Sequence, residues 1–348
     1  MKIGIMSFAH HHAEAYIHHL RAISGVELLG VADEDSERGR SIAETYGARF
    51  YPSYESLLAA GLDGVIITSE NNKHLPMVAM AAAAGINILC EKPLATTVAD
   101  ARAIVDACDQ AGVTLMTAFP MRFSAPLMEI KNRLDAGELG QVYAFNATNQ
   151  GELPTKHRAW FVDKTLAGGG AVVDHTVHLV DIMRWFLGSE VSEVYAQVNR
   201  IFHAAEVEVE TGALEMLTFE DGTFATIDAS WSRPPYWPTW GGLAFEMVTE
   251  RGAVIVDAFK QNLTVYAHAV QRPVWAHWGS DSNRAMLEEF VQAVRQKRTP
   301  RVTGVDGLRA VEVVEAAYRS VETGQPVRLK ESPATPIDKR RKTAHKPS

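Results

Sequence analysis

The chain has 348 residues, of which 47% are hydrophobic and 22% are charged. These values exclude a disordered or collagen-like chain. The length exceeds the roughly 250–300 residues at which one hydrophobic core stops growing, so we expect two domains. The 42 acidic and 34 basic residues give a formal charge of −8, which argues against a nucleic-acid-binding protein. We expect no membrane span, because no apolar run reaches the roughly 18 residues that one requires.

The cysteine content indicates the cellular compartment. Cys90 and Cys108 are too few for a disulfide framework and are typical of a reducing environment. The N-terminal residues lack the small-residue cleavage site of a signal peptide. We therefore expect a cytoplasmic protein.

Strand-like and helix-like segments alternate over the first third of the chain. Apolar runs at residues 2–6, 26–32, 64–68, 86–90 and 113–118 predict strands, and residues 12–23, 36–46, 75–84 and 98–111 predict helices. This alternation is typical of βαβ units that surround a parallel sheet. We therefore predict an α/β domain over residues 1–120, with a doubly wound parallel sheet.

After about residue 120 the pattern becomes rich in strands. Runs at 141–149, 191–201, 207–219, 223–231 and 243–248 predict strands, and two helices at 282–296 and 306–323 close the domain. Asp221-Gly222 predicts a tight hairpin, because glycine supplies the positive φ that such a turn needs. We predict an α+β domain over 121–330 with a large, mostly antiparallel open sheet, followed by a disordered basic tail over 331–348.

The turn after the first strand is a candidate nucleotide site. A dinucleotide-binding fingerprint has three glycines there, whereas Ser7, Ala9 and His12 occupy those positions in this chain, with Phe8 and His10 between them. Serine and alanine are small enough for a backbone amide to approach a phosphate. The next helix begins with free N–H groups and the positive end of its dipole. We expect these five residues to contact a cofactor.

Asp33 ends the second predicted strand. A carboxylate there accepts hydrogen bonds from a ribose diol and repels a 2′-phosphate, which favours NAD over NADP. An ordinary loop acid or helix cap is the other interpretation, and the residue by itself does not decide between them.

The histidines at positions 10, 11, 12, 18 and 19 raise the question of a metal site. Adjacent helical residues point about 100° apart, so three in succession cannot all face one ion. Structural metal sites also usually add cysteine or carboxylate ligands. We expect no metal, with one imidazole in the cofactor or substrate cleft and the others on the surface.

Glu91-Lys92-Pro93 directly follows the predicted strand at 86–90. Ligands of open α/β sheets bind at the carboxyl ends of the strands. A lysine there can lower the pKa of a substrate hydroxyl or stabilise a developing alkoxide. An exposed loop lysine is the alternative.

A triple glycine at residues 168–170 leads into a predicted helix that carries Asp174, His178 and Asp181. The spacing places all three on about one helix face. A carboxylate one turn from an imidazole can orient it and raise its basicity, and histidine is suited to proton transfer near neutral pH. A surface Asp–His pair is the alternative, which the glycines weaken because such loops mark close packing or a ligand.

Together these features resemble the Gfo/Idh/MocA oxidoreductase family, which includes inositol dehydrogenases and glucose–fructose oxidoreductase. The similarity covers residues 1 to about 330, and the motifs that carry it are Asn71-Asn72-Lys73-His74, Glu91-Lys92-Pro93, Ala118-Phe119-Pro120-Met121-Arg122-Phe123, Trp160 with Asp163, and the segment from Gly168 to Asp181. The chain departs from the family at the three glycines of the first turn. It also has Thr176 where the family's Asp-x-Gly-x-His motif has glycine.

The resemblance implies an N-terminal Rossmann domain and a C-terminal sheet that buries one face in homodimers or homotetramers. It implies an NAD(P)-dependent enzyme that transfers hydride to or from a hydroxyl or carbonyl of a sugar, cyclitol or related polyol. Lys92, Asp174 and His178 match the catalytic residues of the family. The residues expected to border the cofactor are Ser69, Asn71, His74, Glu91 and Lys92.

In the oxidation direction we expect His178 to take the hydroxyl proton and Lys92 to bind the oxygen as negative charge develops. Asp174 would orient the histidine or hold a neighbouring substrate hydroxyl. Arg122, Trp160 and His175, together with the Trp-rich segment 231–240, are candidate substrate-binding residues beside Asp174 and His178.

Two alternatives stay open. One is a glycosidase of the same fold that uses bound NAD transiently. The other is a non-catalytic regulator that binds a nucleotide or a sugar, for which the missing glycines are the motive. Retention of Lys92, Asp174 and His178 argues against the regulator, because a sensor needs no proton relay.

Overall fold

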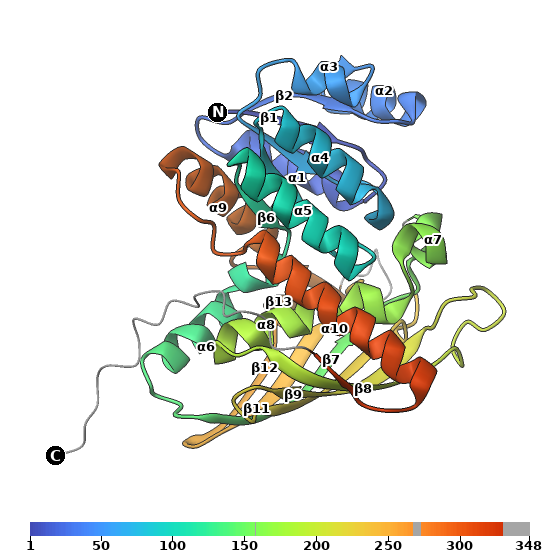
Figure 1. The fold of residues 1–348 in the computed structure, drawn as a ribbon, viewed down its shortest axis with the longest axis vertical. Helices are drawn as coiled ribbons and strands as arrows, with labels where there is room; N and C mark the ends of the chain where they lie inside the picture. The colour runs from blue at the N-terminus through green and yellow to red at the C-terminus, as the bar shows by residue number, and fades with distance from the viewer. Residues whose placement is uncertain (157, 267–272, 330–348) are drawn as a thin grey trace.

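The computed structural model describes residues 1–156, 158–266 and 273–329. Two sheets lie one above the other with helices between and around them, as Figure 1 shows. The tail predicted over residues 331–348 lies outside the described residues. No helix within the described ranges is long and apolar enough to cross a membrane.

The first sheet confirms the predicted doubly wound arrangement. Its strands are β1 (Lys2–Met6), β2 (Glu27–Ala32), β3 (Phe50–Tyr51), β4 (Gly64–Ile67), β5 (Asn87–Cys90) and β6 (Leu115–Thr117). They are parallel and run in the order β3-β2-β1-β4-β5-β6. The helices are α1 (His12–Ala22), α2 (Ser36–Thr45), α3 (Tyr54–Leu58), α4 (His74–Ala83) and α5 (Val98–Ala111). The short β3 and α3 were not predicted, because neither is long enough to show a hydrophobic period.

Local signals explain where the helices begin and end. The side chain of Asp35 accepts hydrogen bonds from the first-turn amides of α2, and Thr97 caps α5 in the same way. Gly112 ends α5 with φ 66°, a left-handed conformation that favours glycine. The strand order reverses between β1 and β4, so the loops after these strands diverge and leave a crevice at the carboxyl edge of the sheet.

The second sheet is mixed. Its strands are β7 (Val142–Gln150), β8 (Val191–Asn199), β9 (Gly212–Phe219), β10 (Phe224–Ser230), β11 (Leu243–Thr249), β12 (Gly252–Asp257) and β15 (Val327–Arg328), in the order β12-β11-β7-β10-β9-β8-β15. Neighbours are antiparallel except β7 and β10, which are parallel. The predicted β9–β10 hairpin is present, and Gly222 in its turn has φ 89°.

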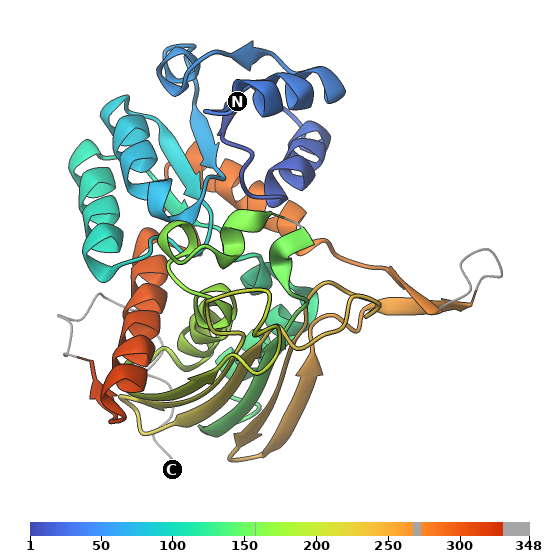
Figure 2. The ribbon, with the colours of Figure 1, turned by 90° about the vertical axis from the view of Figure 1, so that its right-hand side faces the viewer.

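A hairpin of β13 (Asn262–Tyr266) and β14 (Pro273–His277) projects away from the body of the molecule, as Figure 2 shows. This hairpin, β12 and β15 were not predicted. The helix α6 (Ala125–Asp135) was also missed.

The closing helices do not both belong to the second sheet. The helix α9 (Ser282–Gln296) packs against α1, which is in the first half of the chain. The helix α10 (Gly304–Thr323) contacts α5 on one side and α8 (Val177–Leu187) and β8 on the other (Figure 1). A continuous hydrophobic core therefore runs from one face of the first sheet into the helices that cover the second. This shared core fixes the carboxyl edge of the first sheet next to the segment that precedes α8.

Candidate active site

Lys92 and Asp174 meet between the two sheets. Lys92 follows β5 at the carboxyl edge of the first sheet, and Asp174 lies in the π-helical turn η5 (Val172–Thr176) that precedes α8. The Lys92 ammonium donates to Asp174 Oδ1 at 2.7 Å and to the Asp174 carbonyl oxygen at 3.3 Å. Both side chains are buried. The structure therefore brings two of the predicted catalytic residues into direct contact.

The second oxygen of the Asp174 carboxylate is also engaged. Trp231 Nε1 donates to Oδ2 at 3.2 Å, and His175 Nε2 lies 3.1 Å from the same oxygen. Burial alone would raise the pKa of Asp174, but the charges of Lys92 and His175 outweigh it and hold the pKa well below its usual range. Asp174 is therefore ionised at neutral pH. We expected Asp174 to contact His178. Among the described residues, the carboxylate instead contacts Lys92, Trp231 and His175.

His178 lies in the first turn of α8. The centroid of its ring is 6.0 Å from that of the Phe119 ring, and the two rings are inclined at 70°. Burial, and after it the Lys92 charge, lowers the pKa of His178 well below 6.5. The imidazole is therefore neutral at pH 7. Its Nδ1 is buried and has no hydrogen-bond partner among the described residues.

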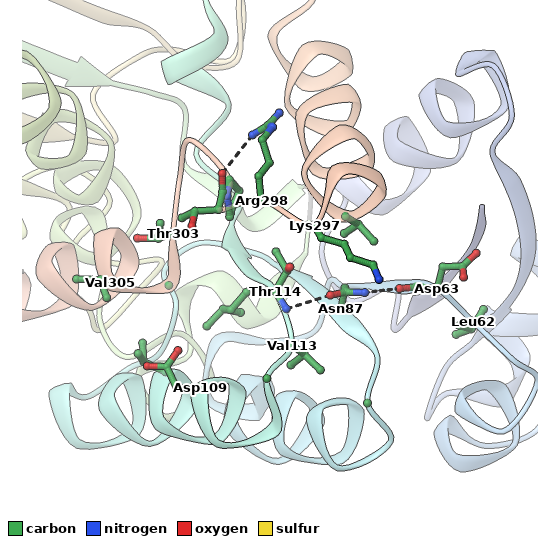
Figure 3. Close-up of a pocket in the computed structure, with 18 residues that line it drawn as sticks. Leu62, Asp63, Asn87, Asp109, Val113, Thr114, Lys297, Arg298, Thr303 and Val305 are labelled. Carbon is green, nitrogen blue, oxygen red and sulfur yellow. Dashed lines mark hydrogen bonds between the residues drawn. The ribbon is translucent and has the colours of Figure 1, made fainter. Parts of the chain in front are cut away.

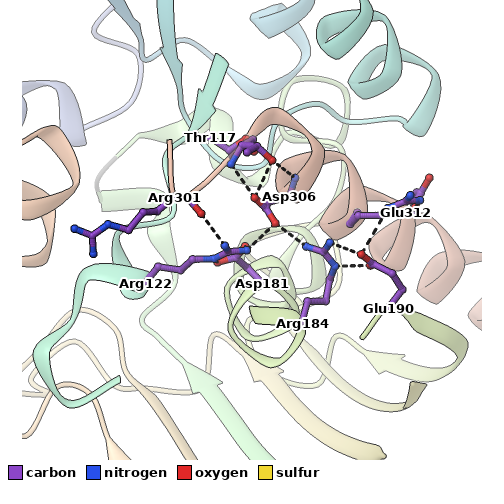
Figure 4. Close-up of polar contacts among 10 residues, drawn as sticks. Thr117, Arg122, Asp181, Arg184, Glu190, Arg301, Asp306 and Glu312 are labelled. Atoms are coloured by element: carbon purple, nitrogen blue, oxygen red, sulfur yellow. Dashed lines mark hydrogen bonds and ion pairs between the residues drawn. The ribbon is translucent and has the colours of Figure 1, made fainter. Parts of the chain in front are cut away.

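Asp181 points to a different group. Figure 4 shows its carboxylate against the Arg122 guanidinium, with Asp306 and Arg184 close by. Arg122 donates to Asp181 through Nε at 2.7 Å and to Asp306 Oδ1 through Nη2 at 2.8 Å. Contrary to the prediction, Asp181 does not join Asp174 and His178 at this site, because its carboxylate, which α8 carries, is bonded to Arg122. Arg122 is engaged by the buried Asp181 and the partly buried Asp306, and we remove it from the substrate-binding residues.

The β1–α1 loop takes a fingerprint-like shape without glycines. Ser7 has φ 73°, the left-handed conformation that usually favours glycine. The Phe8 amide donates to Asp33 Oδ2 at 2.7 Å, and the His10 amide donates to the Thr68 carbonyl at 2.9 Å. The loop is therefore held against the ends of β2 and β4, with Ala9 buried within it.

His12, at the third glycine position, points towards β5. Its Nδ1 lies 3.1 Å from Glu91 Oε1, to which Tyr16 Oη also donates at 2.5 Å. Glu91 Oε2 accepts the Lys92 amide at 3.1 Å. Burial would raise the pKa of Glu91, but His10, His12 and these hydrogen bonds lower it well below its usual range. The first helix is thus tied to the residue before Lys92. We did not single out Tyr16, although its spacing of four from His12 places it on the same helix face.

His10, His12 and Glu91 form a cluster whose potential metal-ligand atoms lie within 4.8 Å of one another. His10 and His12 can face one point although they are close in sequence, because His10 precedes the helix that His12 begins. The Glu91 oxygens already accept hydrogen bonds from His12, Tyr16 and the Lys92 amide. We therefore describe the cluster as a hydrogen-bonded network that supports the loop.

Several buried polar atoms at the carboxyl edge fit a nucleotide cofactor. Within the described part of the chain, His10 Nε2, Asn71 Oδ1 and His74 Nε2 have no hydrogen-bond partner. His74 Nδ1 faces the carbonyls of Pro93 and Leu94 at 3.0 and 3.2 Å, so it donates and leaves Nε2 as an acceptor. An unpartnered buried polar atom costs free energy, which a bound polar ligand would recover.

The other predicted cofactor residues lie at the same edge. Asp33 directly follows β2 and is buried, and Arg38 donates to its two oxygens at 2.7 and 2.9 Å. Ser69 follows β4, and its hydroxyl donates to the Glu70 carbonyl at 3.1 Å. Asn71 Nδ2 donates to the Ala167 carbonyl at 2.8 Å, which joins this edge to the loop before the triple glycine.

Trp160 lies closer to the cofactor loop than we expected. Its Nε1 donates to the Ala9 carbonyl at 2.9 Å, and its ring stacks on Phe161 at 4.1 Å. A small cavity beside them is lined by Asn71, Lys92, Phe161, Gly170 and Asp174. The glycines of this loop are required by packing, because a Cβ on Gly170 would lie 2.0 Å from the Glu210 carbonyl oxygen.

A larger pocket, of about 910 Å³, lies elsewhere (Figure 3). Its lining includes Asn87 and Leu115, which begin β5 and β6, and Asp109 and Lys297. This is the amino edge of the first sheet, opposite Lys92. The lining does not include Lys92, Asp174 or His178, so we place the active site at the carboxyl edge.

Comparisons with known proteins identify relatives of this chain. Residues 3–119 match the model of an oxidoreductase family with an NAD-binding Rossmann fold, and residues 127–255 match the GFO/IDH/MocA C-terminal domain. The chain is 32% identical to D-xylose 1-dehydrogenase (NADP(+)) 2 of Haloferax volcanii, over 94% of this chain and 100% of that protein. It is 27% identical to scyllo-inositol 2-dehydrogenase (NAD(+)) of Bacillus subtilis, over 94% and 95%. The structure of GenD2 from gentamicin A biosynthesis, in complex with NAD, is 26% identical with a TM-score of 0.86, over 95% and 97%.

Proposed function

This chain belongs to the Gfo/Idh/MocA family of oxidoreductases, and we propose that it transfers hydride between NAD and a hydroxyl or carbonyl of a sugar, cyclitol or related polyol. The observation that carries the proposal is the buried Lys92–Asp174 ion pair, which lies at the edge of an NAD-binding Rossmann domain with His178 beside it. The names of the relatives, which include sugar and inositol dehydrogenases, support the substrate class.

Each of the three residues has a separate task in the proposed oxidation. A bound nicotinamide supplies the hydride acceptor. The neutral imidazole of His178 accepts the hydroxyl proton through Nε2, because Nδ1 is buried. The Lys92 ammonium binds the substrate oxygen as negative charge develops on it. Asp174 accepts a hydrogen bond from the Lys92 ammonium and fixes its position.

The cofactor preference rests on Asp33. Its buried carboxylate directly follows β2, where it would accept hydrogen bonds from the ribose diol and repel a 2′-phosphate. Arg38 holds this carboxylate and partly offsets its charge. We therefore propose NAD as the preferred cofactor, with NADP bound more weakly.

The exposed face of the second sheet supports a homo-oligomer. As Figures 1 and 2 show, helices cover one face of this sheet and leave the other open. Large apolar side chains on its strands are exposed: Tyr143, Leu214, Met216, Phe224, Val248 and Ile255. Monomeric proteins seldom expose apolar patches of this kind. We propose that this face, defined by these six residues, joins two copies of the chain in a homodimer, from which a homotetramer can be built.

The cell compartment and the domain limits are part of the same proposal. Cys90 and Cys108 are both buried as free thiols, which suits the reducing cytoplasm. We propose residues 1–120 as the cofactor domain and 121–330 as the substrate and oligomerisation domain, with α9 packing back onto the first.

The test uses the purified full chain. NAD and NADP are titrated by protein fluorescence, and myo-inositol, scyllo-inositol, D-xylose and D-apiose are then screened for NADH absorbance. We expect NAD to bind and at least one polyol to be oxidised. Bound NAD with no turnover of any polyol would contradict the proposal. In that case, hydrolysis of an aryl glycoside without net NADH would indicate a glycosidase, and ligand-dependent association with another protein would indicate a regulator. Neither alternative is favoured now, because the relatives named above are dehydrogenases.

A further inference from the structure

We propose that Trp231 is a positioning residue, which fixes the plane of the Asp174 carboxylate and, through it, the ammonium of Lys92. The inference rests on the proposed function, because it concerns the residues to which that function assigns catalysis. From the sequence we placed Trp231 among the candidate substrate-binding residues. In the structure its side chain is completely buried, and its indole nitrogen donates to Asp174 Oδ2.

The Trp231 indole is held in place by the second sheet and by a small hydrophobic cluster. Trp231 directly follows β10, whose last residue pairs with β7 on one side and with β9 on the other. The Trp231 backbone amide donates to the Thr211 carbonyl at 2.8 Å. The indole packs in one cluster with Leu153, Ala171, Val207 and Val209. A tryptophan side chain turns only about χ1 and χ2, and burial among these residues leaves its N–H in one direction.

Two side chains donate hydrogen bonds to the Asp174 carboxylate within the described part of the chain. The Lys92 ammonium donates to Oδ1 at 2.7 Å, and Trp231 Nε1 donates to Oδ2 at 3.2 Å. His175, which we predicted to bind substrate, has its Nε2 3.1 Å from Oδ2, but this nitrogen makes no hydrogen bond there. An indole nitrogen only donates, so the contact from Trp231 does not depend on the protonation of a histidine.

The effect on Lys92 follows from the way an aspartate side chain turns. Its last torsion joins an sp³ carbon to an sp² carbon and has a broad energy minimum. One hydrogen bond at Oδ1 therefore leaves the plane of the carboxylate free to rotate. The second bond, from Trp231 to Oδ2, removes this freedom and fixes the position of Oδ1.

The lysine ammonium follows the position of its counter-ion, because it is carried by a flexible stem. A catalytic group must be held within about 0.5 Å of its productive position, and a misplacement of about 1 Å costs on the order of a hundredfold in rate. Trp231 thus acts on the reaction through Asp174 and Lys92, without contacting the substrate.

The test introduces Trp231→Phe into two backgrounds, the wild type and Asp174→Asn. Phenylalanine keeps an aromatic ring in the hydrophobic cluster and removes only the N–H donor. In Asp174→Asn the amide oxygen accepts from Lys92, and the amide nitrogen that faces Trp231 cannot accept a hydrogen bond. Val209→Ala, at a buried position of the same cluster, is the control for lost packing. All variants are compared for thermal unfolding, NAD affinity, and kcat and KM with whichever polyol of the panel turns over fastest.

We expect Trp231→Phe to lower kcat about tenfold, as a displaced catalytic group does. It should leave KM and the dissociation constant for NAD within about twofold of the wild type, because the lost contact acts on the chemical step. In the Asp174→Asn background the same substitution should change kcat by less than about twofold, because the hydrogen bond is already absent.

The control separates positioning from packing. Val209→Ala should lower the unfolding temperature without a comparable fall in kcat. An equal fold-loss of kcat from Trp231→Phe in the two backgrounds would overturn the inference and indicate a merely structural role. The same fall of kcat in Val209→Ala as in Trp231→Phe would also overturn it.

A second readout requires no substrate. The seven tryptophans each give one indole N–H resonance in ¹⁵N-labelled protein, and that of Trp231 is assigned by its absence in Trp231→Phe. We expect this proton to move upfield in Asp174→Asn, because it then no longer bonds to a carboxylate oxygen.

An unmoved Trp231 resonance would overturn the inference even if the enzyme is active. Were Trp231→Phe unable to fold, the wild type and Asp174→Asn would still decide, since an unchanged set of indole resonances would overturn the inference. Failure of every polyol to turn over would contradict the proposed function, and the spectrum would still decide whether Trp231 holds Asp174.

Discussion

Lys92 Nζ and Asp174 Oδ1 lie 2.7 Å apart although 82 residues separate them in the chain. The pair is buried, and a buried ion pair seldom adds stability over apolar residues of similar size, because both charges lose their hydration. Its location at the carboxyl edge of a nucleotide-binding sheet, where ligands of such sheets bind, indicates that the cost is offset by a function.

Lys92→Ala should abolish most of the activity while NAD still binds. We expect kcat to fall about 100- to 1,000-fold, as when one charge-stabilising donor is removed from an active site. NAD binding by fluorescence should persist, because the cofactor loop does not depend on this ammonium. Lys260→Ala, at an exposed position, serves as the matched control. Full activity in a clean Lys92→Ala preparation would discard the assignment.

The same substitution leaves the Asp174 charge buried without its lysine. We expect Lys92→Ala to lose about 3–5 kcal/mol of unfolding free energy. Adding Asp174→Asn should recover part of this loss, because the unpaired charge is removed. Urea unfolding of the single and double variants measures both values, and an equal loss in the two would show that the buried charge is not the cause.

His178→Asn should lower the rate about 100-fold, a typical contribution of a general base. In the wild type, oxidation needs the neutral imidazole, and the pKa of His178 is lowered by burial and Lys92. Activity should therefore be lost only as the pH falls below the usual histidine range, and not near neutrality. Protonation of Asp174 also lowers the rate at low pH. The part of the acid limb of the pH–rate profile that disappears in His178→Asn is therefore the part that belongs to the histidine. An unchanged pH–rate profile in the variant would count against the general base.

Asp33→Asn should weaken NAD and strengthen NADP. The amide keeps an acceptor for the Phe8 amide, but it loses the charge that repels a 2′-phosphate, and Arg38 is freed to bind that phosphate. We expect about a tenfold rise in the dissociation constant for NAD, as for one charge-assisted hydrogen bond. Adding Arg38→Ala should remove the gain in NADP affinity. A preference for NADP in the wild type, measured by fluorescence titration, would contradict this interpretation.

Arg122→Met should affect stability and leave the chemistry intact. Without the guanidinium, Asp181 and Asp306 lose their shared ion-pair partner. We therefore expect the free energy of unfolding to fall by about 3–5 kcal/mol. Burial raises the pKa of Asp181 to about 6 even beside Arg122, and without the arginine it should rise further. The loss should therefore be larger at pH 8 than at pH 5, where Asp181 is protonated.

The pKa of Asp306 is shifted in the opposite direction to that of Asp181. Arg122 and Arg184 outweigh its burial and lower its pKa below the ordinary 3.8. Its stabilisation is present above pH 3.8 and is lost as the pH falls through the lowered value.

The Arg122→Met prediction is checked by urea unfolding at pH 5 and pH 8, with Arg133→Met, at an exposed position, as the control. A large rise in KM for the polyol, without a loss of stability, would restore Arg122 as a substrate residue.

Met216→Glu with Leu214→Glu should break the proposed homodimer. Both side chains are more than half exposed on β9, and a buried pair of like charges at a two-fold interface is strongly unfavourable. Light scattering should show a dimer or tetramer for the wild type and smaller species for the variant. Glu44→Lys, on the exposed side of α2, should not change the mass. A wild-type monomer would contradict the role of this face.

The periodic elements were predictable because their signals are local. The helix α5 begins and ends at the predicted residues, and β5 and α2 differ by one residue at an end. The hairpin at Gly222 followed from its turn residues. The segments that were missed, such as β3, α3 and β15, are too short to show a period, and they form because a neighbouring strand or helix is already in place.

The candidate site divides in the same way. Lys92, Asp174, His178 and Asp33 were predicted from their positions after predicted strands and glycines, which depend only on nearby sequence. The sequence did not predict three sets of contacts. They are the hydrogen bond from Trp231 to Asp174, the bond from Tyr16 to Glu91 and the bond from Arg122 to Asp181.

The sequence by itself therefore determined the fold class, the order of the elements and the residue types at the carboxyl edge of the first sheet, because hydrophobic periods and turn residues act over a few positions. Only the tertiary structure decided which charges meet. Contacts between segments many residues apart select the partner of each buried carboxylate, as Lys92 does for Asp174 and Arg122 for Asp181.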